Sequence, residues 1–200
     1  AIHGGVRFVA AYPITPATEM LEWLSPALAR VGGALLQAED ELASINMIIG
    51  ASFGGVPSLT ATAGPGLALM TEGIGLAVAA EVPVVVVDVM RGGPSTGQPT
   101  KAEQGDLLTA MFGSHGDAPK VVIAASTIED CFYSVITARK IAETFNMVVV
   151  VLTDAGLATS QQPFPRPQFS ENWLAPPIDQ TPVPAGAKPY DWDKTMGLAR

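Results

Sequence analysis

Three carboxylates, Glu39, Asp40 and Glu41, stand in succession where an apolar segment gives way to a helical pattern. Because a helix N-terminus stabilises negative charge, capping alone accounts for part of this cluster. Three adjacent acids are more than a cap requires. Glu41 shares the helical period of Ile45 and Ile48, and this period directs its side chain toward a buried or interfacial face. A carboxylate among apolar neighbours suits proton transfer, so Glu41 is the candidate for acid–base chemistry.

Arg91 ends an apolar run and opens a loop of small residues that spans 92–97. A planar guanidinium at that point suits bidentate binding of a carboxylate. The alternative role is structural, as an ion pair with Asp88 or another nearby acid. Thr15 holds the equivalent place after the first apolar run. Its hydroxyl either bonds a ligand oxygen or only shapes a turn between two prolines.

A third segment of this kind, Gly64-Pro65-Gly66, lies between an apolar run and a helical pattern. Free N–H groups at the start of that helix could hold an anion. The glycines could equally serve a tight turn from strand to helix. Neither a Gly-x-Gly-x-x-Gly segment after the first run nor a Gly-x-x-x-x-Gly-Lys-Ser/Thr segment occurs, and a nicotinamide-binding domain is disfavoured.

Residues that commonly bind metals are scarce. His3 and His115 are the only histidines, and their separation gives no metal-ligand spacing, so we expect no metal site in this chain. Cys131 is the single cysteine, which excludes a disulfide or a cysteine-ligated cluster within this sequence. Any iron–sulfur centre has to come from elsewhere.

The candidate residues have to be positioned by a regular alternation of apolar runs and amphipathic segments. The expected strands span 7–11, 34–37, 58–61, 84–89, 120–124 and 148–152. The expected helices span 18–31, 41–53, 67–80 and 128–145, the last with Thr127 as its N-cap, and a long loop spans 90–119. Strands that are apolar on both faces and separated by helices predict an α/β fold with a doubly wound parallel sheet. Such sheets bind ligands at the carboxyl ends of their strands, where the three loops would meet.

Composition limits the classes of partner. The 200 residues are 48% apolar, which suffices for one sizeable core, expected at 1–155. Nineteen acidic against eleven basic side chains give a net charge of −8 without a basic cluster, so nucleic acid is disfavoured. Apolar runs stop well short of the ~20 residues needed to cross a bilayer, and we expect a soluble, cytoplasmic protein with no membrane partner. The sequence opens without Met, and we expect it to be a segment of a longer polypeptide.

The composition changes at 156–200, where proline, glutamine and aromatic residues replace the periodic pattern. Such a segment is either a Pro-rich linker or arm that wraps over a partner and leads to a further domain, or a disordered tail. Trp173 and Trp192 favour docking, because large aromatic side chains favour buried contacts.

Several ordered motifs together resemble the alpha subunit of the 2-oxoacid:ferredoxin oxidoreductases, closest in pattern to the 2-oxoglutarate type. The matching segments are Tyr12-Pro-Ile-Thr-Pro16 with Thr18-Glu19, Gln37-Ala-Glu-Asp-Glu41, Thr60-Ala-Thr-Ala-Gly-Pro-Gly66, Arg91-Gly-Gly-Pro-Ser-Thr-Gly97, Pro99-Thr-Lys101, Gln104-Gly-Asp106 and His115-Gly-Asp117. They cover roughly the first 155 residues in order.

The resemblance implies the pyrimidine-binding domain of a thiamine diphosphate enzyme. A partner beta subunit would carry the diphosphate-binding domain with Mg²⁺, which agrees with the absence here of a Gly-Asp-Gly motif followed by Asn at the usual distance. Glu41 matches the glutamate at the ring nitrogen of the aminopyrimidine, where it would stabilise the imino tautomer that takes the proton from the thiazolium carbon. Pro13, Ile14, Gly64 and Gly66 would also contact this cofactor.

The resemblance also implies substrate contacts. Thr15 and Arg91 match residues that contact the carboxylate and carbonyl oxygens of the substrate, and Ser95 and Thr96 lie in a loop that would close beside it. The implied reaction is coenzyme A-dependent oxidative decarboxylation of a 2-oxoacid, with 2-oxoglutarate favoured, or the reverse carboxylation. Electrons would pass through 4Fe–4S clusters of a partner subunit to ferredoxin, in a dimer of heterodimers.

Two other functions are compatible with the same residues. A non-oxidative thiamine diphosphate-dependent 2-oxoacid decarboxylase, which is a lyase, would use the same domain without ferredoxin, clusters or coenzyme A. A non-catalytic assembly domain would use the carboxylates and Arg91 in interface salt bridges. The assembly role predicts that Glu41→Gln changes assembly and leaves turnover per assembled complex intact.

Overall fold

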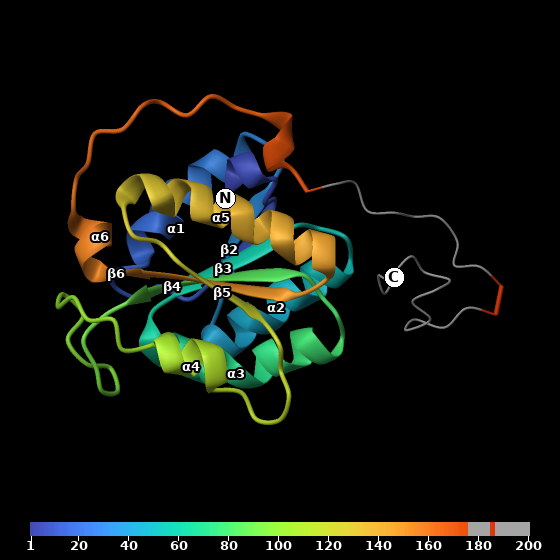
Figure 1. Cartoon of the computed structure of the whole chain (residues 1–200), viewed down its shortest axis with the longest axis horizontal. Helices are drawn as coiled ribbons and strands as arrows, with labels where there is room; N and C mark the ends of the chain where they lie inside the picture. The colour runs from blue at the N-terminus through green and yellow to red at the C-terminus, as the bar shows by residue number, and fades with distance from the viewer. Residues whose placement is uncertain (176–184, 187–200) are drawn as a thin grey trace.

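All six strands of the described chain lie parallel in one sheet, in the order β2-β1-β3-β4-β6-β5 (Figure 1). The computed structural model describes residues 1–175 and 185–186. The strands are β1 (Phe8–Ala11), β2 (Ala34–Gln37), β3 (Ser58–Thr62), β4 (Val84–Met90), β5 (Val121–Ala124) and β6 (Val148–Asp154). The helices are η1 (Ile2–Gly4), α1 (Thr18–Ala29), α2 (Glu41–Phe53), α3 (Gly64–Ala79), α4 (Leu107–Phe112), α5 (Ile128–Phe145), α6 (Ala155–Thr159) and η2 (Glu171–Trp173). The predicted α/β fold with a doubly wound parallel sheet is confirmed.

Helices cover both faces of the sheet (Figure 1). Helices α1 and α5 pack on one face, and α2, α3 and α4 pack on the other. Successive side chains of β4 alternate between the two layers: Val85 and Val87 join the α1 and α5 side, while Val84 and Val86 join the α2 and α3 side. Because both faces are buried, continuous valine runs rather than alternating patterns form the central strands.

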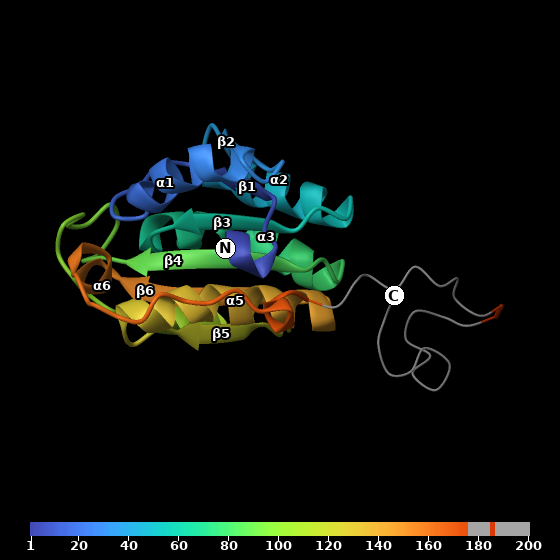
Figure 2. The same cartoon turned by 90° about the horizontal axis from the view of Figure 1, so that it is seen from above.

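The direction in which the chain crosses the sheet reverses after β2, because β1 lies between β2 and β3 (Figure 2). At such a point neighbouring connections leave on opposite faces and open a ligand site at the carboxyl ends of the strands. Thr62 at the end of β3 lies in register with Asp88 near the end of β4. The loops after β1, β3 and β4 therefore leave the sheet at the same edge.

The predicted strands and helices are present, with ends shifted by a few residues. Helix α3 begins at Gly64 rather than at residue 67, because Pro65 is accommodated in its first turn. Thr127 caps α5 as predicted, its hydroxyl accepting a hydrogen bond from the N–H of Asp130 at 3.0 Å. The sequence does not indicate α4, which lies within the expected loop, or α6; both helices are too short to show a helical period.

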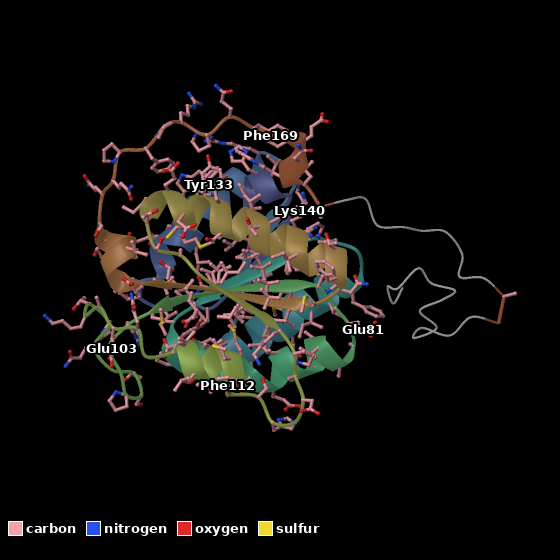
Figure 3. All side chains as sticks on the ribbon, in the orientation of Figure 1. Glu81, Glu103, Phe112, Tyr133, Lys140 and Phe169 are labelled. Atoms are coloured by element: carbon pink, nitrogen blue, oxygen red, sulfur yellow. The ribbon has the colours of Figure 1, made fainter. Side chains whose placement is uncertain are left out.

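The described part of the C-terminal segment lies against α5 (Figure 3). Helix η2 brings Trp173 next to four other rings, with centroid separations of 5.8 to 6.0 Å: His3, Phe132, Tyr133 and Phe169. Lys140 Nζ donates a hydrogen bond to the carbonyl of Asn172 at 3.0 Å. Trp173 is thus docked on the domain of its own chain, while Trp192 lies outside the described residues.

Trp173→Ala is expected to release this docked part of the segment, because the indole makes the ring contacts that hold it. We expect the free energy of unfolding to fall by about 1–2 kcal/mol, and cleavage in 160–172 by a protease to accelerate. Trp23→Ala is the matched control, since Trp23 is 66% exposed on α1. Equal cleavage rates in the two variants would contradict the docking.

None of the helices in 1–175 is long and apolar enough to pass through a membrane. Within the described chain, no three His, Cys, Asp or Glu side chains are grouped so that they could hold a metal ion. Cys131 is half-buried, and burial raises the pKa of its thiol.

Candidate active site

Glu41 begins α2 at the carboxyl edge of the sheet and is only 6% exposed. Its neighbour Asp40 caps the helix, with Oδ1 accepting a hydrogen bond from the N–H of Ala43 at 2.7 Å, and Glu39 is exposed. Capping therefore requires only Asp40. The carboxylate of Glu41 has no hydrogen-bond partner within the described residues, so its oxygens are available to a donor on a bound ligand.

Gly66, in the first turn of α3, lies directly against Glu41. A Cβ at this position would stand 2.7 Å from Glu41 Cγ and 2.8 Å from Glu41 Oε1, and it would collide with Thr62 Oγ1. Thr62 is fully buried at the end of β3. Only a residue without a side chain allows the backbone of α3 to approach this closely. Gly66 thus serves the close approach of α3 to the candidate acid.

Gly66→Ala is expected to lower the free energy of unfolding by about 2–3 kcal/mol, because the added methyl group overpacks the space between Thr62 and Glu41. Gly75→Ala is the control in the same helix, where a Cβ would meet no atom within 4 Å. That change should raise stability by up to about 1 kcal/mol, as alanine favours the helix. Urea unfolding of both variants measures the difference, and equal stabilities would contradict the packing at Gly66.

Arg91 joins two loops of the site. Its Nη1 donates a hydrogen bond to the carbonyl of Thr15 at 2.7 Å, and its Nη2 donates one to the carbonyl of Thr96 at 2.6 Å. The side chain is 8% exposed, and Nε is buried without a partner in the described chain. Arg91 forms no ion pair with Asp88 or any other acid among the described residues. The guanidinium charge therefore has no counter-ion there, which leaves it suited to a ligand carboxylate.

The remaining predicted residues surround this centre. The side chains of Thr15, Ser95 and Thr96 are exposed, and their hydroxyl groups form no hydrogen bonds within the described part of the chain. Pro13 is half-buried, and Ile14 packs against the core on the α1 side. The structure thus brings Thr15 and Thr96 to Arg91 through their backbone carbonyls rather than through their hydroxyls.

Two carboxyl groups that the sequence does not place in the site, Asp88 and Asp106, lie next to each other. Asp88 is fully buried in β4. Asp106 is half-buried at the start of α4, and both of its carboxylate oxygens lie 2.7 Å from the place of a Gly64 Cβ. Burial, together with the charge of Asp106 and a hydrogen bond to it, raises the pKa of Asp88 to about 8. Burial also raises the pKa of Asp106. A signal was present in the sequence, because Asp88 interrupts a valine run.

The residues present fit the aminopyrimidine of thiamine diphosphate. Its ring nitrogen needs a carboxylate in a water-poor place, and Glu41 is buried, lacks a partner in the described residues and lies against a glycine that leaves no side chain between them. A doubly wound sheet with such a glutamate at its carboxyl edge fits a cofactor-binding α/β domain of the thiamine diphosphate class.

The chain belongs to the family described as pyruvate flavodoxin/ferredoxin oxidoreductase, thiamine diphosphate-binding, whose model matches residues 1–198. It is 49% identical over 154 residues to the 2-oxoglutarate synthase subunit KorA of Archaeoglobus fulgidus, covering 77% of this chain and 44% of that protein. It is 40% identical over 194 residues to the 2-oxoglutarate oxidoreductase subunit KorA of Mycobacterium tuberculosis, covering 96% and 29%. The chain thus spans less than half the length of these curated relatives.

Solved structures resemble the chain as well. A 2-oxoglutarate:ferredoxin oxidoreductase from Magnetococcus marinus, solved with 2-oxoglutarate, coenzyme A and succinyl-CoA bound, superimposes with a TM-score of 0.82 at 51% identity. The match covers 84% of this chain and 29% of that chain. A putative thiamin diphosphate-dependent enzyme from Mycobacterium smegmatis matches with a TM-score of 0.58 at 17% identity, a likeness of fold alone. The resemblance inferred from the motifs is confirmed at the level of the family.

Proposed function

We propose that this chain is the pyrimidine-binding part of the alpha subunit of a thiamine diphosphate-dependent 2-oxoacid:ferredoxin oxidoreductase. The observation that carries this proposal is the buried carboxylate of Glu41, which lies against Gly66 without a partner in the described residues. The family and its named relatives support the oxidoreductase over the lyase. Because those relatives are named for 2-oxoglutarate, that substrate is the favoured one.

When bound, thiamine diphosphate supplies a carbanion-forming thiazolium carbon that adds to the 2-oxo carbon of the substrate. Glu41 holds a proton at the ring nitrogen of the aminopyrimidine and so favours the imino tautomer, whose exocyclic nitrogen is the base. Burial of Glu41 excludes water from this proton. Gly66 keeps the space beside the carboxylate free of a side chain. Pro13, Ile14 and Gly64 complete the proposed cofactor contacts.

Arg91 and Thr15 bind the 2-oxoacid in this proposal. The guanidinium holds the loops after β1 and β4 together through the carbonyls of Thr15 and Thr96, and its uncompensated charge attracts the substrate carboxylate. The exposed hydroxyls of Thr15, Ser95 and Thr96 lie on these two loops and are free to bond substrate oxygens. Nε and the second N–H of each terminal nitrogen of Arg91 remain as donors for direct contact with the substrate.

The complete enzyme in this proposal includes parts outside this chain. A beta subunit carries the diphosphate-binding domain with Mg²⁺, and a partner subunit carries 4Fe–4S clusters that pass electrons to ferredoxin, while coenzyme A accepts the acyl group. The assembly is a cytoplasmic dimer of heterodimers. Residues 1–155 form the pyrimidine-binding domain, and 156–200 form the Pro-rich arm that leads to a further domain.

The test uses the complete enzyme and measures reduction of a viologen dye that depends on both a 2-oxoacid and coenzyme A. We expect reduction with 2-oxoglutarate, together with acyl-CoA formation and release of carbon dioxide. Carbon dioxide release without dye reduction would contradict the proposal and favour the lyase. Absence of any dependence on thiamine diphosphate would also contradict it.

A further inference from the structure

The carboxyl group of Asp88 is fully buried within the sheet, where a charged side chain is unfavourable unless a partner stabilises it. The register of β4 places it between Thr62 of β3 and Leu152 of β6. Neither of its oxygens has a hydrogen-bond donor within the described residues. An ionised carboxylate left in this condition would cost several kcal/mol, so the group has to be neutral or share a proton with a neighbour.

Asp106 supplies that neighbour. Its carboxyl group lies within hydrogen-bonding reach of Asp88, and its Oδ2 is likewise buried without a donor in the described residues. Carboxylates only accept hydrogen bonds, and two in contact repel each other. One proton between them satisfies an oxygen on each side and leaves a single negative charge for the pair. Burial raises the pKa of both groups, and Asp88 is the more deeply buried of the two, so Asp88 holds the proton.

We propose that Asp88 and Asp106 form an acid pair, joined by one shared proton, that positions the cofactor and substrate loops of the active site. This role rests on the proposed function, because the acid pair holds Glu41 and Arg91 in the positions in which they would bind the cofactor and the substrate. Asp88 and Asp106 act through other residues and are positioning residues, not catalytic ones.

The position of the acid pair supports this role. Asp106 contacts Gly64 and Glu41 contacts Gly66, so the first turn of α3 touches the acid pair at one glycine and the candidate acid at the next. Asp106 also ends the loop that starts at Arg91. A displaced Asp106 therefore moves both the turn that packs on Glu41 and the loop whose Thr96 carbonyl holds Arg91.

The loop that spans 91–106 is also held by two hydrogen bonds near its ends. The N–H of Gly93 donates a hydrogen bond to Glu103 Oε2 at 2.8 Å, and Gln104 Nε2 donates one to Asp154 Oδ2 at 2.7 Å (Figure 3 labels Glu103). The hydrogen bonds that Asp154 accepts from Gln104 and from backbone N–H groups lower the pKa of its carboxyl group. The acid pair, by contrast, loses a proton as the pH rises.

The pH dependence follows from the direction of the shift. The folded chain keeps a proton on Asp88 to about pH 8, whereas the unfolded chain releases it near 3.8, so the free energy of unfolding falls as the pH rises through this window. The titratable group that faces the pair from the loop is Glu103, whose charge contributes to the raised pKa of Asp106. Because Glu103 is an acid, it does not compensate the second charge of the deprotonated pair.

The test compares the complete wild-type enzyme with Asp88→Asn, Asp88→Ala and the surface control Glu22→Gln. Asparagine donates an N–H to Asp106 at every pH, so Asp88→Asn should retain the attachment without its titration. Amide hydrogen exchange of 91–106, measured on each variant at the same pH, reports the attachment without requiring turnover. The pH profile of kcat/KM for the 2-oxoacid reports its effect on the site.

Above about pH 8, we expect kcat/KM to fall in the wild type and in Glu22→Gln but not in Asp88→Asn. At the same pH, the amides of 91–106 should exchange roughly tenfold faster in the wild type and in Glu22→Gln than in Asp88→Asn. Asp88→Ala should exchange fast at all pH values, and the asparagine variant keeps the test valid if the alanine variant fails to fold. Identical pH profiles and exchange rates in wild type and Asp88→Asn would overturn the acid pair. If the wild-type enzyme shows no 2-oxoacid turnover, the proposed function fails, whereas a pH-dependent exchange difference still supports the pair.

Discussion

Glu41→Gln is expected to lower kcat for 2-oxoacid-dependent dye reduction by about a thousandfold, the size typical for loss of an acid–base group. Glutamine fills the same buried space beside Gly66 but cannot give or take a proton at the aminopyrimidine. Because shape is preserved, thiamine diphosphate should still bind and the subunits should still assemble. Steady-state turnover, cofactor titration and size-exclusion chromatography measure the three quantities on one preparation.

Glu39→Gln is the matched control for this prediction, since Glu39 is exposed and precedes the helix by two positions. Its turnover should equal that of the wild type. Full turnover by an assembled Glu41→Gln enzyme would show that the wrong carboxylate has been assigned. Altered assembly with intact turnover per assembled complex would instead support a purely structural role for the domain.

Arg91→Met is expected to lower kcat/KM for the 2-oxoacid by about a hundredfold, with most of the loss in KM. The change removes the charge that has no counter-ion in the described chain and the two bonds that hold the carbonyls of Thr15 and Thr96. Methionine keeps the apolar stem, so packing around β4 should change little. Initial rates at varied 2-oxoacid concentration measure the effect.

The control for Arg91→Met is Arg30→Met at the exposed end of α1, which should leave KM unchanged. An unchanged KM in the Arg91 variant, with kcat alone reduced, would contradict carboxylate binding and assign Arg91 only to holding the loops.

The sheet and its long helices could be predicted because their sequence patterns are strong. Valine runs at 84–87 and 148–151 leave both faces apolar. Helix α5 has its cap at the predicted Thr127, and one of the three adjacent acids, Asp40, caps α2. Helix α4 could not be predicted, because six residues with four exposed apolar side chains show no amphipathic period.

The site was predictable by residue type but not by contact. The sequence points to Arg91 and Thr15, yet the contact between them runs through a backbone carbonyl, which no side-chain pattern encodes. Likewise, the pairing of Asp88 with Asp106 depends on the path of a loop whose ends are far apart in sequence. The sequence indicates that Gly66 lies in a turn, but only the packed structure reveals that it lies against Thr62 and Glu41.

The most direct measurement is the exchange of the thiazolium C2 proton of thiamine diphosphate with solvent deuterium in the complete enzyme, followed by acid quench and proton NMR. Wild type and Glu39→Gln should exchange at the same rate, and Glu41→Gln should exchange about a thousandfold more slowly with the cofactor still bound. An unchanged exchange rate in the fully loaded Glu41→Gln enzyme would contradict the role of Glu41 as the group that activates the cofactor.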